Sequence, residues 1–140
     1  MNKQAEIYKL TLANKVSELE RIKSVIDKLS QDWNIPLKTG LSINLALEEA
    51  FTNIVNYAFT DNEAHSIEIV FTKNAGQLII TLSDDGIEYD PTQNKDPQID
   101  LPVQDRQVGG LGIYLIRKLM DKVEYKRESG KNYLTLTKNL

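Results

Sequence analysis

Residues 47–58 read LEEAFTNIVNYA, and this stretch determines how the rest of the chain is interpreted. Apolar side chains recur along it at steps of three and four residues, which is the period of an amphipathic α-helix. The apolar positions are Leu47, Phe51, Ile54 and Ala58. Because Pro36 marks a break upstream, we expect one long helix from about residue 38 to residue 58, with this apolar face against a core.

The other face of the same helix carries three polar residues: Glu49, Asn53 and Asn56. Asparagine is a poor helix former, and these two have mostly apolar neighbours, so we expect another part of the protein to cover this face. A carboxylate beside a carboxamide can accept a proton from an attacking hydroxyl while the amide oxygen coordinates magnesium. Taken alone, the pattern also fits an ordinary solvated helix surface.

On the N-terminal side of this helix, the sequence predicts a strand and a second helix. Residues 7–12 alternate loosely, as a strand with one covered face does. From Val16 to Leu29, apolar residues again recur at helical steps, and Asn14 is expected to cap that helix.

Strand patterns dominate the C-terminal side. We expect three further elements there: a hairpin over residues 66–83, a helix over residues 112–121 and a hairpin over residues 123–137. Strands joined by tight turns pair antiparallel. The order of elements therefore predicts an α+β fold, a two-layer α/β sandwich whose mixed, largely antiparallel sheet has three helices on one face.

The second polar motif ends a strand, where residues 82–86 read LSDDG. A carboxylate fixed at the strand end, here Asp84, can accept a hydrogen bond from an exocyclic amine such as that of adenine. Gly86 would let a ring approach the backbone closely. The alternative is a plain Asp-Gly turn.

The third motif is GGLG at residues 109–112, which runs directly into the last predicted helix. Backbone N–H groups at a helix N-terminus attract phosphate, whereas a simple flexible hinge is the alternative. No Lys-Ser or Lys-Thr follows the glycines, so this is not a Walker loop. The loop between the second and third motifs holds three of the four prolines, and its length calls for a functional reason.

Composition excludes several classes of protein. The 140 residues suit one domain, and a net charge of -3 offers no basic footprint for nucleic acid. With no cysteine and one histidine, a zinc site is excluded. No apolar run approaches the roughly 20 residues of a membrane span, so we expect a cytoplasmic protein without membrane or nucleic-acid partners.

In their order along the chain, the three motifs resemble the ATP-binding Bergerat fold shared by gyrase, heat-shock protein 90, histidine kinases and MutL (the GHKL group). EAFTN resembles the N box of that group, DDG its first glycine box and GGLG its second. DDGIEYDP and GGLGIYLIRKLMD resemble, more closely, the anti-sigma-factor serine kinases of the RsbW and SpoIIAB type. The resemblance covers nearly the whole chain.

The resemblance implies one ATP-binding domain over residues 1–140, with an ATP lid at about residues 86–111. Its cofactors would be ATP and Mg²⁺. Asp84 would bind the adenine amine, Glu49 would act as the general base, and Asn53 would hold the magnesium ion. The remaining nucleotide-binding positions would be Asn56, Gly86, Gly109, Gly110, Leu111 and Gly112.

The resemblance also implies protein partners. The substrate would be a serine on a STAS-domain antagonist, whose phosphorylation frees the kinase to sequester a sigma factor or a similar regulatory protein. The family resemblance is also the only indication of a homodimer. Glu88 stands where the first glycine box often has a second glycine, which leaves open the alternative of a non-catalytic, ATP-binding partner-switching module.

Overall fold

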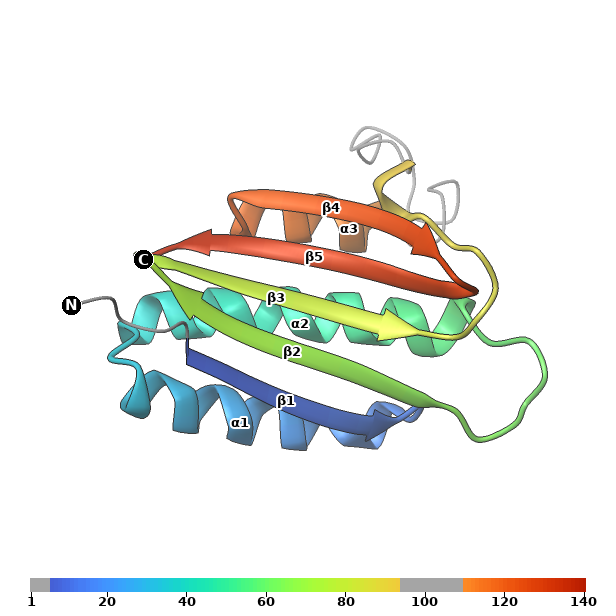
Figure 1. Cartoon of the computed structure of the whole chain (residues 1–140), viewed down its shortest axis with the longest axis horizontal. Coiled ribbons are helices and arrows are strands. Elements are labelled where there is room, and N and C mark those ends of the chain that lie inside the picture. The colour runs from blue at the N-terminus through green and yellow to red at the C-terminus, as the bar shows by residue number, and fades with distance from the viewer. Residues whose placement is uncertain (1–5, 94–109) are drawn as a thin grey trace.

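The computed structural model describes residues 6–93 and 110–140, which form a sheet with helices packed on it (Figure 1). Two single-turn 3₁₀ helices, η1 and η2, accompany the helices and strands. The elements in chain order are β1 (Glu6–Ala13), η1 (Val16–Glu18), α1 (Leu19–Asp32), α2 (Leu37–Tyr57), β2 (Ser66–Asn74), β3 (Gln77–Asp84), η2 (Pro91–Gln93), α3 (Gly110–Leu119), β4 (Lys122–Glu128) and β5 (Lys131–Asn139).

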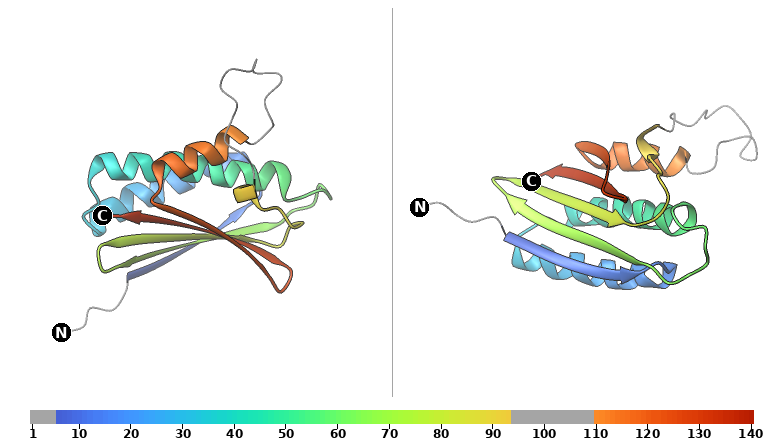
Figure 2. Two further views of the ribbon diagram at one scale, coloured as in Figure 1. Left: turned by 90° about the horizontal axis from the view of Figure 1, so that it is seen from above. Right: turned by 45° about the vertical axis from the view of Figure 1, so that its right-hand side comes forward.

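The sheet has five strands in the order β1-β2-β3-β5-β4, and α1, α2 and α3 lie together on one face of it (Figure 2). The two-layer α+β sandwich predicted from the sequence is therefore confirmed. All four pairings between the described strands are antiparallel, so a sheet expected to be mixed contains no parallel pair in this part of the chain. Two hairpins account for half of these pairings.

The core lies between the sheet and the three helices. Alternate residues of β2 and β3 turn toward the helices and are buried, namely Ile67, Ile69, Phe71, Leu78, Ile80 and Leu82. The middle helix, α2, packs between α1 and α3 and buries the stripe that the sequence predicted, which comprises Leu47, Phe51, Ile54 and Ala58. The alternating apolar residues of the strands and the apolar stripe of the helix thus pack against each other in one apolar layer.

Both predicted hairpins have two-residue turns with left-handed backbone. Ala75 and Gly76 have φ values of 49° and 80°, and Ser129 and Gly130 have 52° and 78°. Positive φ at both central positions is characteristic of the type I′ turn, whose twist matches that of the flanking strands. Glycine at the second position of each turn adopts this conformation without steric cost.

Asn14 does not cap the following helix, contrary to the sequence prediction. Its backbone N–H donates to the carbonyl oxygen of His65 at 3.1 Å, and its Oδ1 accepts from the N–H of His65 at 3.1 Å. The chain instead enters α1 through the η1 turn, whose Glu18 carboxylate accepts the N–H of Ala13 at 2.8 Å. A long-range pairing thus replaces the local cap, and local sequence carries no signal for it.

Gly86 brings the end of β3 against the C-terminus of α2. A Cβ atom on Gly86 would lie 2.3 Å from the carbonyl oxygen of Ala58, and the N–H of Ile87 donates to that same oxygen at 2.8 Å. We expected this glycine to admit a ligand ring. The space beside it is occupied by the protein's own backbone, which gives the glycine a structural reason.

Replacing Gly86 by alanine is therefore expected to destabilise the fold by about 2 kcal/mol or more, because backbone cannot move aside as a side chain can. Urea unfolding followed by circular dichroism measures this change. Gly112→Ala is a matched control, since its new methyl group would meet only the ends of the Asn53 and Glu49 side chains, which can move aside more easily than backbone. Equal losses in the two variants would contradict the assignment.

Candidate functional site

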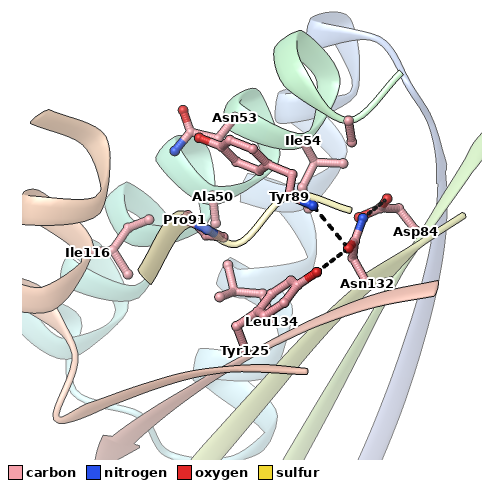
Figure 3. Close-up of a pocket in the computed structure, with 11 residues that line it drawn as sticks. Ala50, Asn53, Ile54, Asp84, Tyr89, Pro91, Ile116, Tyr125, Asn132 and Leu134 are labelled. Carbon is pink, nitrogen blue, oxygen red and sulfur yellow. Dashed lines mark hydrogen bonds between the residues drawn. The ribbon is translucent and has the colours of Figure 1, made fainter. Parts of the chain in front are cut away.

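A cavity of about 370 Å³, including its open mouth, lies between α2, α3 and the adjoining end of the sheet (Figure 3). Apolar and aromatic side chains make most of its wall: Ala50, Ile54, Ala58, Tyr89, Pro91, Ile116, Tyr125 and Leu134. Three polar side chains complete it: Asn53, Asp84 and Asn132. A concave apolar site with a few fixed polar groups is the usual form of a small-molecule pocket.

Asp84 is the charged group of this cavity, and its side chain is only 4% exposed. Its Oδ1 accepts hydrogen bonds from the N–H of Gly86 at 2.9 Å and from Asn132 Nδ2 at 3.0 Å. No described residue donates to its Oδ2. Burial raises the pKa of this carboxyl, while the two hydrogen bonds and the charge of Arg127 act in the opposite direction. In its ionised form, Asp84 can therefore accept a further hydrogen bond at Oδ2.

Asn53 and Glu49 lie one helical turn apart on α2, beneath the first turn of α3. A Cβ atom on Gly112 would be 3.1 Å from Asn53 Nδ2 and 3.1 Å from Glu49 Oε2. The start of α3 therefore covers this polar face, as the sequence suggested that some segment would. Asn53 is 8% exposed, and its Nδ2 has no hydrogen-bond partner within the described residues.

The other predicted positions are only partly brought together. Glu49 is half-buried and Asn56 is exposed, and neither lines the cavity. Gly110, Leu111 and Gly112 form the beginning of α3, which starts two residues earlier than predicted. Gly109 and most of the predicted lid, residues 94–109, lie outside the described residues.

Sequence reasoning missed several residues that line the cavity. Tyr89 stacks on Tyr57 with ring centroids 5.7 Å apart and an interplanar angle of 29°. Pro91 belongs to η2, which Asp90 stabilises by accepting the N–H of Thr92 at 2.9 Å. Asn132 is the direct cross-strand partner of Asp84. The β3–β5 register is the signal that places it, and register is not readable from one strand alone.

Comparison with known proteins shows the family to which this sequence belongs. Residues 12–138 match the family model of the histidine kinase-like ATPase domain. The chain belongs to the histidine kinase-like ATPase domain family. Membership in this ATPase family implies that the domain uses ATP. Separately, none of the helices in the described part of the chain is long and apolar enough to cross a membrane.

Named relatives of this ATPase domain include protein kinases. The chain is 34% identical to serine/threonine-protein kinase BtrW of Bordetella bronchiseptica over 109 residues, which are 78% of this chain and 75% of BtrW. It is 35% identical to serine-protein kinase RsbW of Halalkalibacterium halodurans, over 63% of this chain and 56% of that protein. The chain thus spans little more than half the length of that RsbW.

A solved structure shares the fold of this ATPase domain. The RsbU and RsbW domains of Rv1364c from Mycobacterium tuberculosis align with 96% of this chain and 32% of that one, with a TM-score of 0.69. Because identity is 14%, the likeness concerns the fold.

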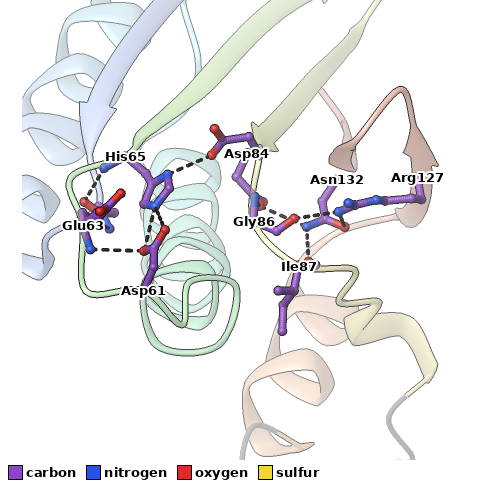
Figure 4. A network of polar contacts seen from close by, with 10 residues as sticks. Asp61, Glu63, His65, Asp84, Gly86, Ile87, Arg127 and Asn132 are labelled. Atoms are coloured by element: carbon purple, nitrogen blue, oxygen red, sulfur yellow. Dashed lines mark hydrogen bonds and ion pairs between the residues drawn. The ribbon is translucent and has the colours of Figure 1, made fainter.

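Beside the cavity of this ATPase domain, His65 joins two carboxylates (Figure 4). Its Nε2 lies 2.8 Å from Asp61 Oδ2, and its Nδ1 lies 3.2 Å from Asp85 Oδ1. The imidazole also stacks on Phe59, with centroids 4.4 Å apart. No local sequence pattern indicates a partner for this histidine, yet the fold brings two carboxylates to it. The hydrogen bond to Asp61 is the main cause that raises the pKa of His65 above its ordinary 6.5.

NMR titration of the single histidine is expected to show the raised pKa, and Asp61→Asn is expected to return it toward 6.5. Because the pKa is raised on folding, the pair stabilises the protein fully below pH 6.5 and loses this effect as pH rises through the folded-state pKa. Asp85→Asn is the matched control, with a smaller decrease. A larger decrease in Asp85→Asn than in Asp61→Asn would contradict this ranking of the contacts.

Proposed function

We propose that this chain is an ATP-dependent protein serine kinase that works by partner exchange. It phosphorylates a STAS-domain antagonist and sequesters a sigma factor or a similar regulatory protein. The observation that carries the proposal is Asp84, a buried carboxylate with one oxygen left unpaired by the described residues, in an apolar cavity of an ATPase-domain chain. The names of BtrW and RsbW as protein kinases support it.

Base recognition rests on Asp84 and the apolar wall. The ring of adenine is flat and apolar on its faces, and its exocyclic amine is a donor that Asp84 Oδ2 accepts. Guanine carries a carbonyl oxygen at that position, which an ionised carboxylate repels. The site should therefore select adenine, because binding guanine would leave the buried Asp84 carboxylate unpaired or facing another oxygen. Such a buried, unsatisfied group weakens binding more than the loss of one ordinary contact does.

The phosphates and their metal belong at the start of α3. Asn53 Nδ2 is a buried donor without a partner among the described residues, which suits a phosphate oxygen bound beside it. The oxygen of the same amide is of the kind that coordinates Mg²⁺, which is the role we propose for it. Magnesium, when bound, neutralises phosphate charge. The first N–H groups of α3, from Gly110 to Gly112, have no acceptor within the helix and attract phosphate. We place the lid at about residues 86–111.

Glu49 serves as the general base for the serine hydroxyl. It is half-buried on the polar face of α2, beside Asn53 and under Gly112, so its carboxylate lies next to the proposed phosphate position. The phosphoserine product is dianionic, and this charge added to the interface would expel the antagonist, which frees the kinase for its second partner. A homodimer follows from the family resemblance alone and stays a prediction.

Asp84→Asn is expected to fold with at least the stability of the parent protein, because it removes a buried charge and keeps an acceptor for Gly86 and Asn132. It should nevertheless lose its preference for ATP over GTP, since the new amide presents a donor to the adenine amine. Isothermal titration with ATP and GTP, with and without magnesium, measures the preference. An unchanged preference would remove Asp84 from the base site.

Glu49→Gln is expected to bind ATP normally and to transfer phosphate at least about a hundredfold more slowly, because it cannot accept the serine proton. The measurement is transfer of labelled γ-phosphate to a purified STAS-domain protein. Glu48→Gln is the matched control, since Glu48 is also half-buried but lies about 100° round the helix from Glu49. If the parent protein binds ATP and transfers no phosphate, the non-catalytic partner-switching module is the correct description.

A further inference from the structure

The side chain of Asn132, at the start of β5, joins three segments that surround Asp84 (Figures 3 and 4). These are the end of β3, the residues directly after it, and β4. Asn132 is 4% exposed, and each polar atom of its amide has at least two partners. Such a buried, fully bonded amide specifies one arrangement of the groups around it.

The donor side of this amide faces two acceptors. Nδ2 donates to Asp84 Oδ1 at 3.0 Å and to the carbonyl oxygen of Ile87 at 2.7 Å. The acceptor side faces donors, since Oδ1 accepts from the hydroxyl of Tyr125 at 2.5 Å and from Arg127 Nη1 at 3.1 Å. Rotating the amide by half a turn would set oxygen against oxygen on one side, so its partners fix its orientation.

Few other side chains can satisfy this set of partners. Aspartate has a similar shape but no donors, and it would place a second carboxylate against Asp84. Threonine has one hydroxyl proton for two acceptors, and alanine or leucine would leave all of them unpaired. The amide also links Arg127 to Asp84: the guanidinium polarises the Asn132 carbonyl, which strengthens donation from its Nδ2.

The arrangement determines which oxygen of Asp84 is left for a ligand. Both described donors, the N–H of Gly86 and Asn132 Nδ2, go to Oδ1, so the carboxylate is held with Oδ2 available. Arg127 also donates to the carbonyl oxygen of Gly86 at 2.8 Å. The carboxylate and the backbone that follows it are therefore held by the same pair of side chains.

We propose that Asn132 is a positioning residue for base recognition: it aims Asp84 Oδ2 at the exocyclic amine of an adenine nucleotide and fixes the first residues of the segment after β3. This inference rests on the proposed function. It adds that amine selectivity resides in the Asp84–Asn132 pair. Arg127 supports the pair from β4.

The test compares the affinities of ATP and purine riboside triphosphate, which is ATP without the exocyclic amine. Their ratio reports the amine contact alone. We expect the parent protein to prefer ATP by about tenfold or more, as for a hydrogen bond to a charged group. Asn132→Ala should bring the ratio close to one while the affinity for the purine analogue changes less than about twofold. Asn139→Ala, an exposed asparagine on the same strand, is the matched control with an unchanged ratio.

Asn132→Asp provides a second variant of nearly the same shape. The ratio in the parent protein should fall as pH drops through the pKa of Asp84, because a protonated carboxyl no longer accepts well at both oxygens. In Asn132→Asp this fall should occur at higher pH. The other charged groups near Asp84 are Asp85 and Arg127, and neither is altered.

The outcomes separate the inference from the proposed function. The positioning role is overturned if both Asn132 variants keep the preference for ATP and lose it at the same pH as the parent protein. That result leaves the kinase proposal standing. Failure of the parent protein to bind ATP overturns the proposed function, and the inference with it. Loss of the preference together with a shifted pH profile supports the inference, since a merely structural defect would weaken both nucleotides alike.

Discussion

The site depends on the direct contact between the end of β3 and the C-terminus of α2. Gly86 has no side chain at the point where the carbonyl oxygen of Ala58 approaches, and the N–H of Ile87 donates to that oxygen. The contact joins the strand that carries Asp84 to the helix that carries Asn53. Two polar residues from distant parts of the sequence thereby line one cavity, and a direct backbone contact between their elements holds their relative position.

Burying Asp84 has a cost that the fold offsets locally. Desolvation raises the pKa of this carboxyl, which means that its ionised form is less favourable here than in water. Hydrogen bonds from the N–H of Gly86 and the amide of Asn132 offset part of this desolvation, and both go to the same oxygen, Oδ1. Full compensation would require a donor on the second oxygen as well. The protein therefore keeps a buried carboxylate with one oxygen unpaired by the described residues, and under the proposed function the nucleotide supplies the missing donor, which would be an exchange of stability for function.

The sequence predicted well what depends on local periodicity. The α2 stripe ending at Ala58, both hairpin turns and the order of elements all follow from patterns within a few residues, and the structure confirms them. Contacts between distant segments escaped prediction. Asn14 pairs with His65 across a long separation rather than capping a helix, and Asn132 meets Asp84 only through the β3–β5 register. Nothing in the local sequence encodes either pairing.

The same distinction explains why the polar face of α2 was readable and its cover was not. Asparagine in mid-helix indicated that the face is not ordinary surface, because the backbone prefers other residues there. The cover is α3, whose last turn is anchored by two long-range contacts. Arg117 donates to the carbonyl oxygen of Thr92 in η2, and Lys138 Nζ donates to the carbonyl oxygen of Leu119 at 2.7 Å. Anchored in this way, α3 holds Gly112 against Glu49 and Asn53, so a group bound at the N-terminus of α3 would contact both side chains. This part of the candidate site is thus formed by the packing of α2 against α3, and any change in their spacing acts on Glu49 and Asn53 together.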